Sequence, residues 1–199
     1  ERAIRTVPTM KRRTRTLLST AIAGSCLALA VPATPASALN VAVRITGRAS
    51  VLPGGVEPAQ RGHSSYAHVS GNGRYIAFSS GSQLVPEDKD TVGDVYVKDL
   101  LTDQLERIDV TKDGKPATSG ALAGAITPDG RYVVFASKAS NLVTGATGAK
   151  SQVFVRDRKT KTTELVSVSS TEVVGNGNSP VDFDVRLDIS DDGRYVAFG

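Results

Sequence analysis

The chain has two histidines, His63 and His68, and the first is followed directly by Ser64 and Ser65. A histidine within reach of a serine can activate it as a nucleophile, but neighbouring residues of an extended strand point to opposite faces of a sheet. Nowhere does the sequence contain G-x-S-x-G, the strand-to-helix turn that exposes a catalytic serine. We interpret residues 63–65 as a polar loop that leads into a strand, and the sequence predicts no catalytic residue.

Acidic residues form a second candidate site in the segment DKDTVGD, residues 88–94. Its spacing resembles a calcium-binding loop, but the fifth position is Val92, which offers no side-chain oxygen, and no bidentate glutamate follows. The corresponding segment of a later repeat, residues 144–151, contains no acid. Turn formation by Asp and Gly explains the segment better, so we predict no metal site and no cofactor. A second group of aspartates, within residues 182–192, is explained by a hairpin turn at Asp192 and by solvated strand edges.

Charged residues also recur at matching positions of a repeat. Asp99 and Asp157 each follow a predicted strand, where a carboxylate can accept backbone N–H bonds of a turn, and we prefer this role to a ligand-facing one. Arg74, Arg131 and Arg194 recur in the same way. We interpret these arginines as structural contacts between strands and not as anion ligands.

Residues 156–161, RDRKTK, are the one basic run after the first 38 residues. We predict a solvent-facing hairpin tip whose charges discourage edge-to-edge pairing of sheets. Because no aromatic residues are interleaved with these cations, we predict no nucleic-acid partner.

The first 38 residues have the pattern of an export signal. Four basic residues within 11–15 follow Met10, an apolar stretch covers 17–31, and Ala-Ser-Ala at 36–38 fits the small-x-small rule for cleavage. The apolar stretch is too short for a membrane span. We predict cleavage after Ala38 and secretion of the remainder. Twin-arginine export through Arg12-Arg13 and lipid attachment at Cys26 are alternatives that the sequence leaves open.

The net charge of +4 belongs to this leader. Removing residues 1–38 takes away six of the 24 Lys and Arg residues and one of the 20 acidic residues, which leaves a net charge of −1. The overall charge therefore no longer favours a nucleic-acid-binding protein. The single cysteine, Cys26, excludes a disulfide framework and any multi-cysteine metal site.

Three segments of the remaining chain share one pattern: NGRYIAF at 72–78, DGRYVVF at 129–135 and DGRYVAF at 192–198. In the first two copies a second pattern follows, DVYVKD at 94–99 and QVFVRD at 152–157. The pattern's glycines are separated by 57 and then 63 residues. A recurrence of this length indicates an architecture of stacked structural repeats.

Each complete copy is predicted to form four antiparallel strands. Asn-Gly or Asp-Gly between apolar runs is the strongest local signal for a hairpin, because these residues accept positive φ. The strand after that turn is apolar on both faces, so we expect it to be buried on both sides. The third and fourth strands are expected at 94–98 and 105–110. No segment after the leader has helical periodicity.

A four-stranded sheet that is apolar on both faces needs a neighbour on each side. Radial stacking of such sheets gives a β-propeller, typically of about 4–8 blades. We predict this all-β fold, with a single β-sandwich as the alternative. The chain accounts for about two and a half blades. We therefore expect a fragment of a larger propeller, with self-assembly of partial propellers as the alternative.

The strings SGNGRYIAFSS, TPDGRYVVFAS and SDDGRYVAF, the first two paired with DVYVKD and QVFVRD, resemble the TolB-type, WD-repeat-like β-propeller family over residues 65–199. The resemblance implies blades whose faces and channel dock protein partners. The chain departs from the family because it has no separate amino-terminal TolB domain, and because its repeat is longer than the usual ~40–45 residues. The motif is structural, so it implies a fold and only weakly a function.

These observations predict six segments: unassigned upstream residues 1–9, signal peptide 10–38, the last strand of a preceding blade at 41–45 with a loop (together 39–64), repeats 65–121 and 122–181, and the start of a truncated third repeat, 182–199. We expect a secreted, non-catalytic scaffold that binds a protein or small ligand on a propeller face or channel, with no membrane span in the mature chain. The alternative implied by related propellers is a regulatory propeller that gates a hydrolase or peptidase.

Overall fold

The computed structural model of the chain describes residues 3–6, 47–146, 148, 150–168 and 186–199. The chain divides into two compact units, Glu1–Thr9 with Arg48–Gly199, and Met10–Gly47. Nearly all of the second unit, with the predicted signal peptide, its cleavage site and the predicted strand at 41–45, lies outside the described residues.

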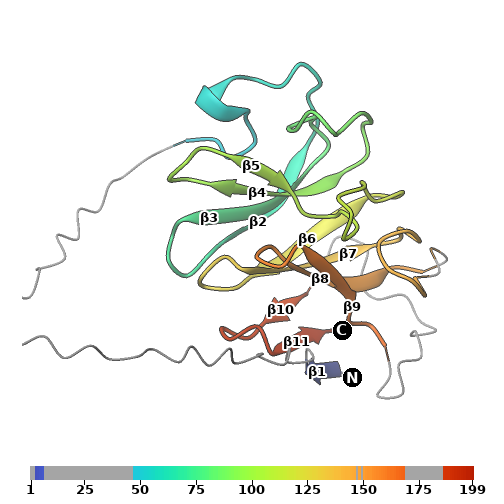
Figure 1. Cartoon of the computed structure of the whole chain (residues 1–199). Coiled ribbons are helices and arrows are strands. Elements are labelled where there is room, and N and C mark those ends of the chain that lie inside the picture. Colours follow the sequence, from blue (N-terminus) through green and yellow to red (C-terminus); the bar gives the residue numbers. More distant parts are fainter. Residues whose placement is uncertain (1–2, 7–46, 147, 149, 169–185) are drawn as a thin grey trace, which may run out of the picture. The chain divides into compact units, whose positions relative to one another are not determined.

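Blade 1 is a four-stranded antiparallel sheet in which the strands lie in chain order (Figure 1). Its strands are β2 (Ser64–Val69), β3 (Tyr75–Ser80), β4 (Asp94–Asp99) and β5 (Leu105–Arg107). The segment before it contains one short 3₁₀ turn, η1 (Pro53–Gly55). The third strand, predicted at 94–98, is therefore confirmed within a residue, and the strand expected after the hairpin turn runs from Tyr75 to Ser80.

Blade 2 repeats this topology (Figure 1). Its strands are β6 (Ala121–Ile126), β7 (Tyr132–Ser137), β8 (Gln152–Asp157) and β9 (Thr162–Leu165). The register repeats as well, since Tyr75 pairs with Asp99 in blade 1 and Tyr132 pairs with Asp157 in blade 2. The prediction of an all-β fold with blades of four antiparallel strands is confirmed for these two sheets.

Blade 3 contains β10 (Asp188–Ile189) and β11 (Tyr195–Phe198). The upstream segment β1 (Ala3–Thr6), which the sequence left unassigned, pairs antiparallel with β11 on the edge opposite β10. In the strand order this is the place that β4 and β8 occupy in blades 1 and 2. Nothing in the repeat pattern of the sequence pointed to this pairing.

Glycine completes the predicted hairpin turns between the first two strands of each blade. Gly73, Gly130 and Gly193 have φ angles of 68°, 75° and 71°. The N–H of each glycine donates to the carbonyl oxygen three residues earlier at 2.8 Å. Asn-Gly and Asp-Gly were therefore correct turn signals, because these turns need a residue that accepts positive φ.

The core lies between the sheets. Val133 and Phe135 of β7 pack in one cluster with Ala77 and Val97 of blade 1, while Val134 of the same strand packs in a second cluster with residues of blade 3. Alternate residues of a strand point to opposite faces, so β7 is covered from both sides. This confirms the prediction that the strand after the hairpin is buried on both faces.

The fourth strand is shorter than the predicted 105–110. The Ile108 N–H still donates to the Val95 carbonyl at 2.8 Å, but the Val95 N–H donates to Oδ1 of Asp109 at 3.0 Å. A carboxylate thus replaces the next main-chain acceptor and ends the ladder. Blade 2 does the same with a hydroxyl, since the Val153 N–H donates to Ser167 Oγ at 3.0 Å.

Candidate functional site

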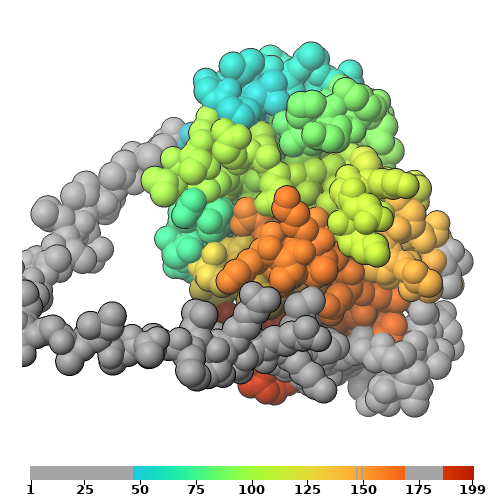
Figure 2. Space-filling model, viewed as in Figure 1, coloured from blue at the N-terminus to red at the C-terminus, as the bar shows by residue number. Residues whose placement is uncertain are grey.

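A polar pocket of about 400 Å³ lies where blades 1 and 2 meet. Blade 1 contributes the beginning of β3 and a residue of β5, and blade 2 contributes the β6–β7 and β8–β9 turns. On the face shown in Figure 2, the residues of blade 1 and of blade 2 form one continuous surface. Seven residues line the pocket: Tyr75, Glu106, Asp129, Gly130, Arg131, Arg158 and Lys159.

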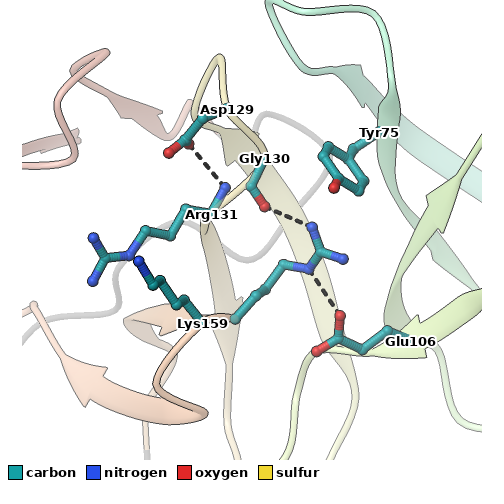
Figure 3. A pocket seen from close by; sticks show the side chains of 7 residues that line it. Tyr75, Glu106, Asp129, Gly130, Arg131 and Lys159 are labelled. Atoms are coloured by element: carbon teal, nitrogen blue, oxygen red, sulfur yellow. Dashed lines mark hydrogen bonds and ion pairs between the residues drawn. The ribbon is translucent and has the colours of Figure 1, made fainter. Parts of the chain in front are cut away.

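Arg158 joins the two blades across the pocket. Its Nε donates to Glu106 Oε2 at 2.8 Å, and its Nη1 donates to the Gly130 carbonyl oxygen at 2.6 Å; dashed lines in Figure 3 mark both bonds. The guanidinium also lies over the Tyr75 ring, 4.6 Å from its centroid. Charge-assisted bonds and a cation–π contact hold this side chain in one orientation.

Tyr75 packs directly against Gly130, as Figure 3 shows. A Cβ atom at position 130 would lie 2.1 Å from Tyr75 Cδ2, and one at Gly193 would lie 2.4 Å from Tyr132 Cδ2. The same tyrosine-on-glycine contact therefore recurs at the next junction between blades. Glycine is needed here both for its positive φ and for the close approach of the ring.

Arg131 and Lys159 lie on the other side of the pocket in Figure 3. Arg131 binds Asp157 with both Nε (3.1 Å) and Nη2 (2.6 Å), and Asp157 also accepts the Lys159 N–H at 2.9 Å. Burial raises the pKa of Asp157, but the bonds from Arg131 and the turn outweigh it and lower the pKa below its usual value. Asp157 is therefore a charged anchor of the β8–β9 turn.

The structure confirms the structural role predicted for the recurring arginines and aspartates of blades 1 and 2. Arg74 binds Asp99 through Nε (2.9 Å) and Nη2 (2.7 Å), and Asp99 accepts the Leu101 N–H at 3.0 Å. The Arg74 guanidinium lowers the pKa of Asp99 well below its usual range. In blade 3, Arg194 lies 3.7 Å from Asp192 and 3.2 Å from the Tyr195 hydroxyl.

The prediction that residues 156–161 form a solvent-facing tip is wrong for two of its cations. Arg156 is buried, and its Nη1 donates to the Thr111 carbonyl (3.2 Å) and to Thr163 Oγ1 (3.0 Å). Arg158 is half-buried in the pocket. The guanidinium groups of both arginines find acceptors in their own blade and in blade 1 or the segment that follows it. Lys159 and Lys161 are exposed as expected.

A second group of polar residues is buried inside blade 1, at the opposite end of β3 and β4. Asp88, Asp94 and Asp109 are at most 3% exposed, and a single cation, Arg107, lies among them. Its Nη2 donates to Asp94 Oδ1 at 2.6 Å and to Asp109 Oδ2 at 3.0 Å. The Tyr96 hydroxyl donates to Asp88 Oδ2 at 2.6 Å. This group, the blade 1 acidic cluster, contains three carboxylates and one guanidinium.

Burial governs the electrostatics of the acidic cluster. It raises the pKa of Asp94 to about 8, helped by the negative charge of Asp109 and opposed by Arg107. Burial also raises the pKa of Asp109, and it raises the pKa of Tyr96 together with the bond to Asp88. One guanidinium therefore does not keep all of these carboxylates ionised at neutral pH.

The segment once compared with a calcium loop contributes part of this cluster. Asp88, Asp90 and Asp94 each place one carboxylate oxygen within 4.8 Å of the others. Asp88 accepts the Asp90 N–H at 3.2 Å, and Asp90 accepts the Val92 N–H at 2.8 Å. These bonds are the turn contacts predicted for the segment. The absence of a metal site remains a prediction.

The residues first considered for catalysis are not brought together. His63 is exposed, and Ser64 Oγ lies 2.9 Å from Ser80 Oγ across the strand pair. His68 is half-buried; burial lowers its pKa, and the charge of Asp188 opposes this. Asp192 accepts a bond from Ser190 Oγ at 2.7 Å in its hairpin turn, as predicted, whereas residues 182 and 184 lie outside the described part.

Sequence reasoning missed the pocket because its residues come from four separated segments. One signal was available in the repeat itself. Position 158 corresponds to position 100, where blade 1 has an exposed leucine. Because the turn of blade 1 forms with an apolar residue at this position, the fold of the repeat does not require a cation there. The difference therefore indicates Arg158 as a candidate functional residue.

No family model matches the chain, and no curated protein matches it. Among solved structures, the chain is similar to a protein assigned as TolB from Agrobacterium tumefaciens, with 15% identity and a TM-score of 0.40 over 69% of this chain and 58% of that one. It is also similar to TolB from Acinetobacter baumannii, with 17% identity and a TM-score of 0.24 over 70% of this chain and 43% of that one. The chain thus spans about half the length of these proteins. Likenesses this loose transfer no ligand or partner.

Proposed function

We propose that this chain is a non-catalytic propeller scaffold that binds a partner at the junction of blades 1 and 2. The observation that carries the proposal is the polar pocket of about 400 Å³, which is shaped by turns from two blades. Loops held on a rigid frame of sheets are common places for recognition. Buried clusters cover both faces of β7, the strand that follows one of the turns lining the pocket. This packing holds that turn in place.

Two observations favour binding over catalysis. The pocket is lined by arginine, lysine, tyrosine and carboxylate side chains, with no serine, cysteine or histidine among them. Its carboxylates are already engaged, Glu106 by Arg158 and Asp129 by the Thr127 hydroxyl at 2.7 Å. The lining therefore lacks the serine–histidine or cysteine–histidine pair of an activated nucleophile.

We also propose that the scaffold is exported, with its mature amino terminus at Leu39. The support is the basic, apolar and small-residue order of residues 11–38. Among the described residues, no helix is long and apolar enough to cross a membrane. Mass spectrometry of the exported protein tests the proposal: a peptide that begins at Leu39 is expected, and intact residues 10–38 would contradict it.

Photo-crosslinking tests the binding role. Lys159 lines the pocket, whereas Lys138 follows β7 directly and is exposed at the opposite end of that strand. A photoreactive amino acid replaces one or the other in producing cells. We expect a discrete adduct from position 159 and none from position 138. Equal labelling from both positions, or no adduct from position 159, would refute the proposal.

A further inference from the structure

The charged groups of the inter-blade pocket are not equally satisfied. Glu106 and Asp129 both accept hydrogen bonds inside the protein. Arg158 donates hydrogen bonds through Nε and Nη1. In the described part of the chain its Nη2 has no acceptor, and neither has the Lys159 ammonium. The pocket thus has three cations against two acids, and each cation, Arg131 through Nη1 included, keeps N–H donors without an acceptor among the described residues, which favours an anionic ligand.

The turn that carries these cations does not require them. In blade 1 the equivalent turn forms with Leu100 and Leu101, where Asp99 accepts the Leu101 N–H at 3.0 Å. In blade 2, Asp157 accepts the Lys159 N–H at 2.9 Å in the same way. The backbone geometry is therefore independent of the side chains. The cationic pair is a feature of the pocket and not of the repeat.

The Arg158 guanidinium is held in place before any ligand arrives. Its side chain is 16% exposed, and it is fixed by Glu106, by the Gly130 carbonyl and by the Tyr75 ring. Little side-chain entropy remains to be lost when its free edge binds an acceptor. Lys159 is exposed and makes no side-chain bond among the described residues, so it adds a mobile second donor.

The size and polarity of the pocket narrow the ligand class. A volume of about 400 Å³ is at the small end for binding sites and accommodates a short segment or a few side chains. Tyr75 is the one aromatic side chain of the lining, and no aliphatic side chain belongs to it. Arg158 lies against Tyr75 and Glu106, and Lys159 lies on the other side of the pocket (Figure 3). Neighbouring carboxylates of a short acidic segment can accept from the two cations without needing an apolar surface.

We infer that the inter-blade pocket binds an acidic peptide segment, with Arg158 Nη2 and Lys159 Nζ as donors to separate carboxylates of that segment. The inference rests on the proposed function, because it names the partner chemistry of the same pocket. Lys159→Gln is the cleanest test, since its side chain contributes no bond to the described fold. Arg158→Gln also removes the contact between the blades, so its urea midpoint has to be measured beside its affinity.

The experiment is a calorimetric titration of the full chain at fixed ionic strength with a hexaglutamate peptide, and with a hexaglutamine peptide as the neutral probe. We expect saturable binding of hexaglutamate only. Lys159→Gln should weaken it by about tenfold, the effect of one charge-assisted hydrogen bond at a partly exposed site. Lys138→Gln, which removes the same charge at the other end of β7, should leave the affinity within about twofold.

Each other outcome has a defined meaning. The inference is overturned if hexaglutamate fails to bind the wild-type chain, if both peptides bind equally, or if the two lysine variants lose affinity equally. Inorganic phosphate, added at the same ionic strength, should compete weakly; binding of phosphate in preference to the peptide would replace the carboxylate by a phosphate ligand and overturn the inference. If calorimetry overturns the inference but a crosslink still forms at residue 159 and not at residue 138, the proposed binding role stands. If no such crosslink forms, both the binding role and the acidic-peptide inference are refuted.

Discussion

The contact between Tyr75 and Gly130 predicts that Gly130→Ala destabilises the protein more than the same change at Gly73. Both glycines have positive φ, 75° and 68°, so each alanine meets a backbone penalty of about 1–2 kcal/mol. A Cβ atom at position 73 would meet nothing within 4 Å, whereas one at position 130 would lie 2.1 Å from Tyr75 Cδ2. Overpacking of this kind typically lowers the free energy of unfolding by about 1–3 kcal/mol, because neighbouring atoms must shift to make room. We expect losses of about 1–2 kcal/mol for Gly73→Ala and about 2–5 kcal/mol for Gly130→Ala.

Urea unfolding at 25 °C, followed by far-UV circular dichroism, measures both losses. The chain has no tryptophan, so tyrosine fluorescence provides the second probe needed to check two-state behaviour. The double variant Tyr75→Ala/Gly130→Ala completes a mutant cycle in which removal of the ring should relieve the clash and reveal a coupling of about 1–3 kcal/mol. If the losses in the free energy of unfolding caused by Gly73→Ala and Gly130→Ala differ by less than ~0.5 kcal/mol, the tyrosine-on-glycine contact does not position the blades.

Three further predictions concern the core and the blade 1 acidic cluster. Phe135→Ala should lower the free energy of unfolding by about 3–5 kcal/mol, because the ring has no exposed surface and stacks on Phe154 at 5.5 Å; a loss under ~1 kcal/mol in urea would contradict its place in the core. Arg107→Leu should cost about 3–5 kcal/mol because it leaves buried carboxylates without a cation. The combined change of the cluster to the blade 2 residues (Asp88→Ala, Asp94→Gln, Tyr96→Phe, Arg107→Leu, Asp109→Ser) should recover most of that loss, while recovery of none would argue against a shared cluster. The pKa of Asp94 is raised to about 8, so the folded state retains a proton that the unfolded state releases above its usual value of 3.8. The contribution of Asp94 to stability therefore falls as pH rises between these values, and Asp94→Asn should flatten the fall seen in urea midpoints from pH 5 to 8; an unchanged slope would contradict the assignment.

The strands and turns were predictable because their signals are local. Asn-Gly or Asp-Gly followed by Arg-Tyr and an alternating apolar run specifies a turn at positive φ and a strand buried on both faces. The structure has both features at Gly73 and Gly130. The roles of Arg74 and Asp99 were also accessible, since an antiparallel neighbour places residues at 75 and 99 opposite one another.

The pocket was not predictable in the same way because it depends on contacts between blades. Arg158 and Glu106 are 52 residues apart, and nothing local indicates that their side chains meet at 2.8 Å. Charge composition was misleading here, since a run of cations suggested a solvated tip while Arg156 is buried. The end of β5 was missed for a related reason: Asp109 looks like a strand residue, yet its side chain takes the place of a main-chain acceptor.

Comparison of the two blades separates residues that build the repeat from residues that serve another purpose. Tyr75 and Tyr132 meet equivalent glycines, and Arg74 and Arg131 bind equivalent aspartates, so these contacts are explained by the fold. The acidic cluster is not shared by the two blades. Blade 2 ends the same strand ladder with Ser167, whose hydroxyl accepts the Val153 N–H and donates to Gln152 Oε1 at 2.5 Å. No carboxylate is buried at these positions of blade 2. The Arg158–Lys159 pair is not shared either, since leucines suffice at the equivalent turn of blade 1. The acidic cluster is paired within blade 1, and Arg158 is paired with Glu106 and the Gly130 carbonyl, whereas the exposed Lys159 has no side-chain partner among the described residues. The acidic segment that we propose would supply a partner for Lys159.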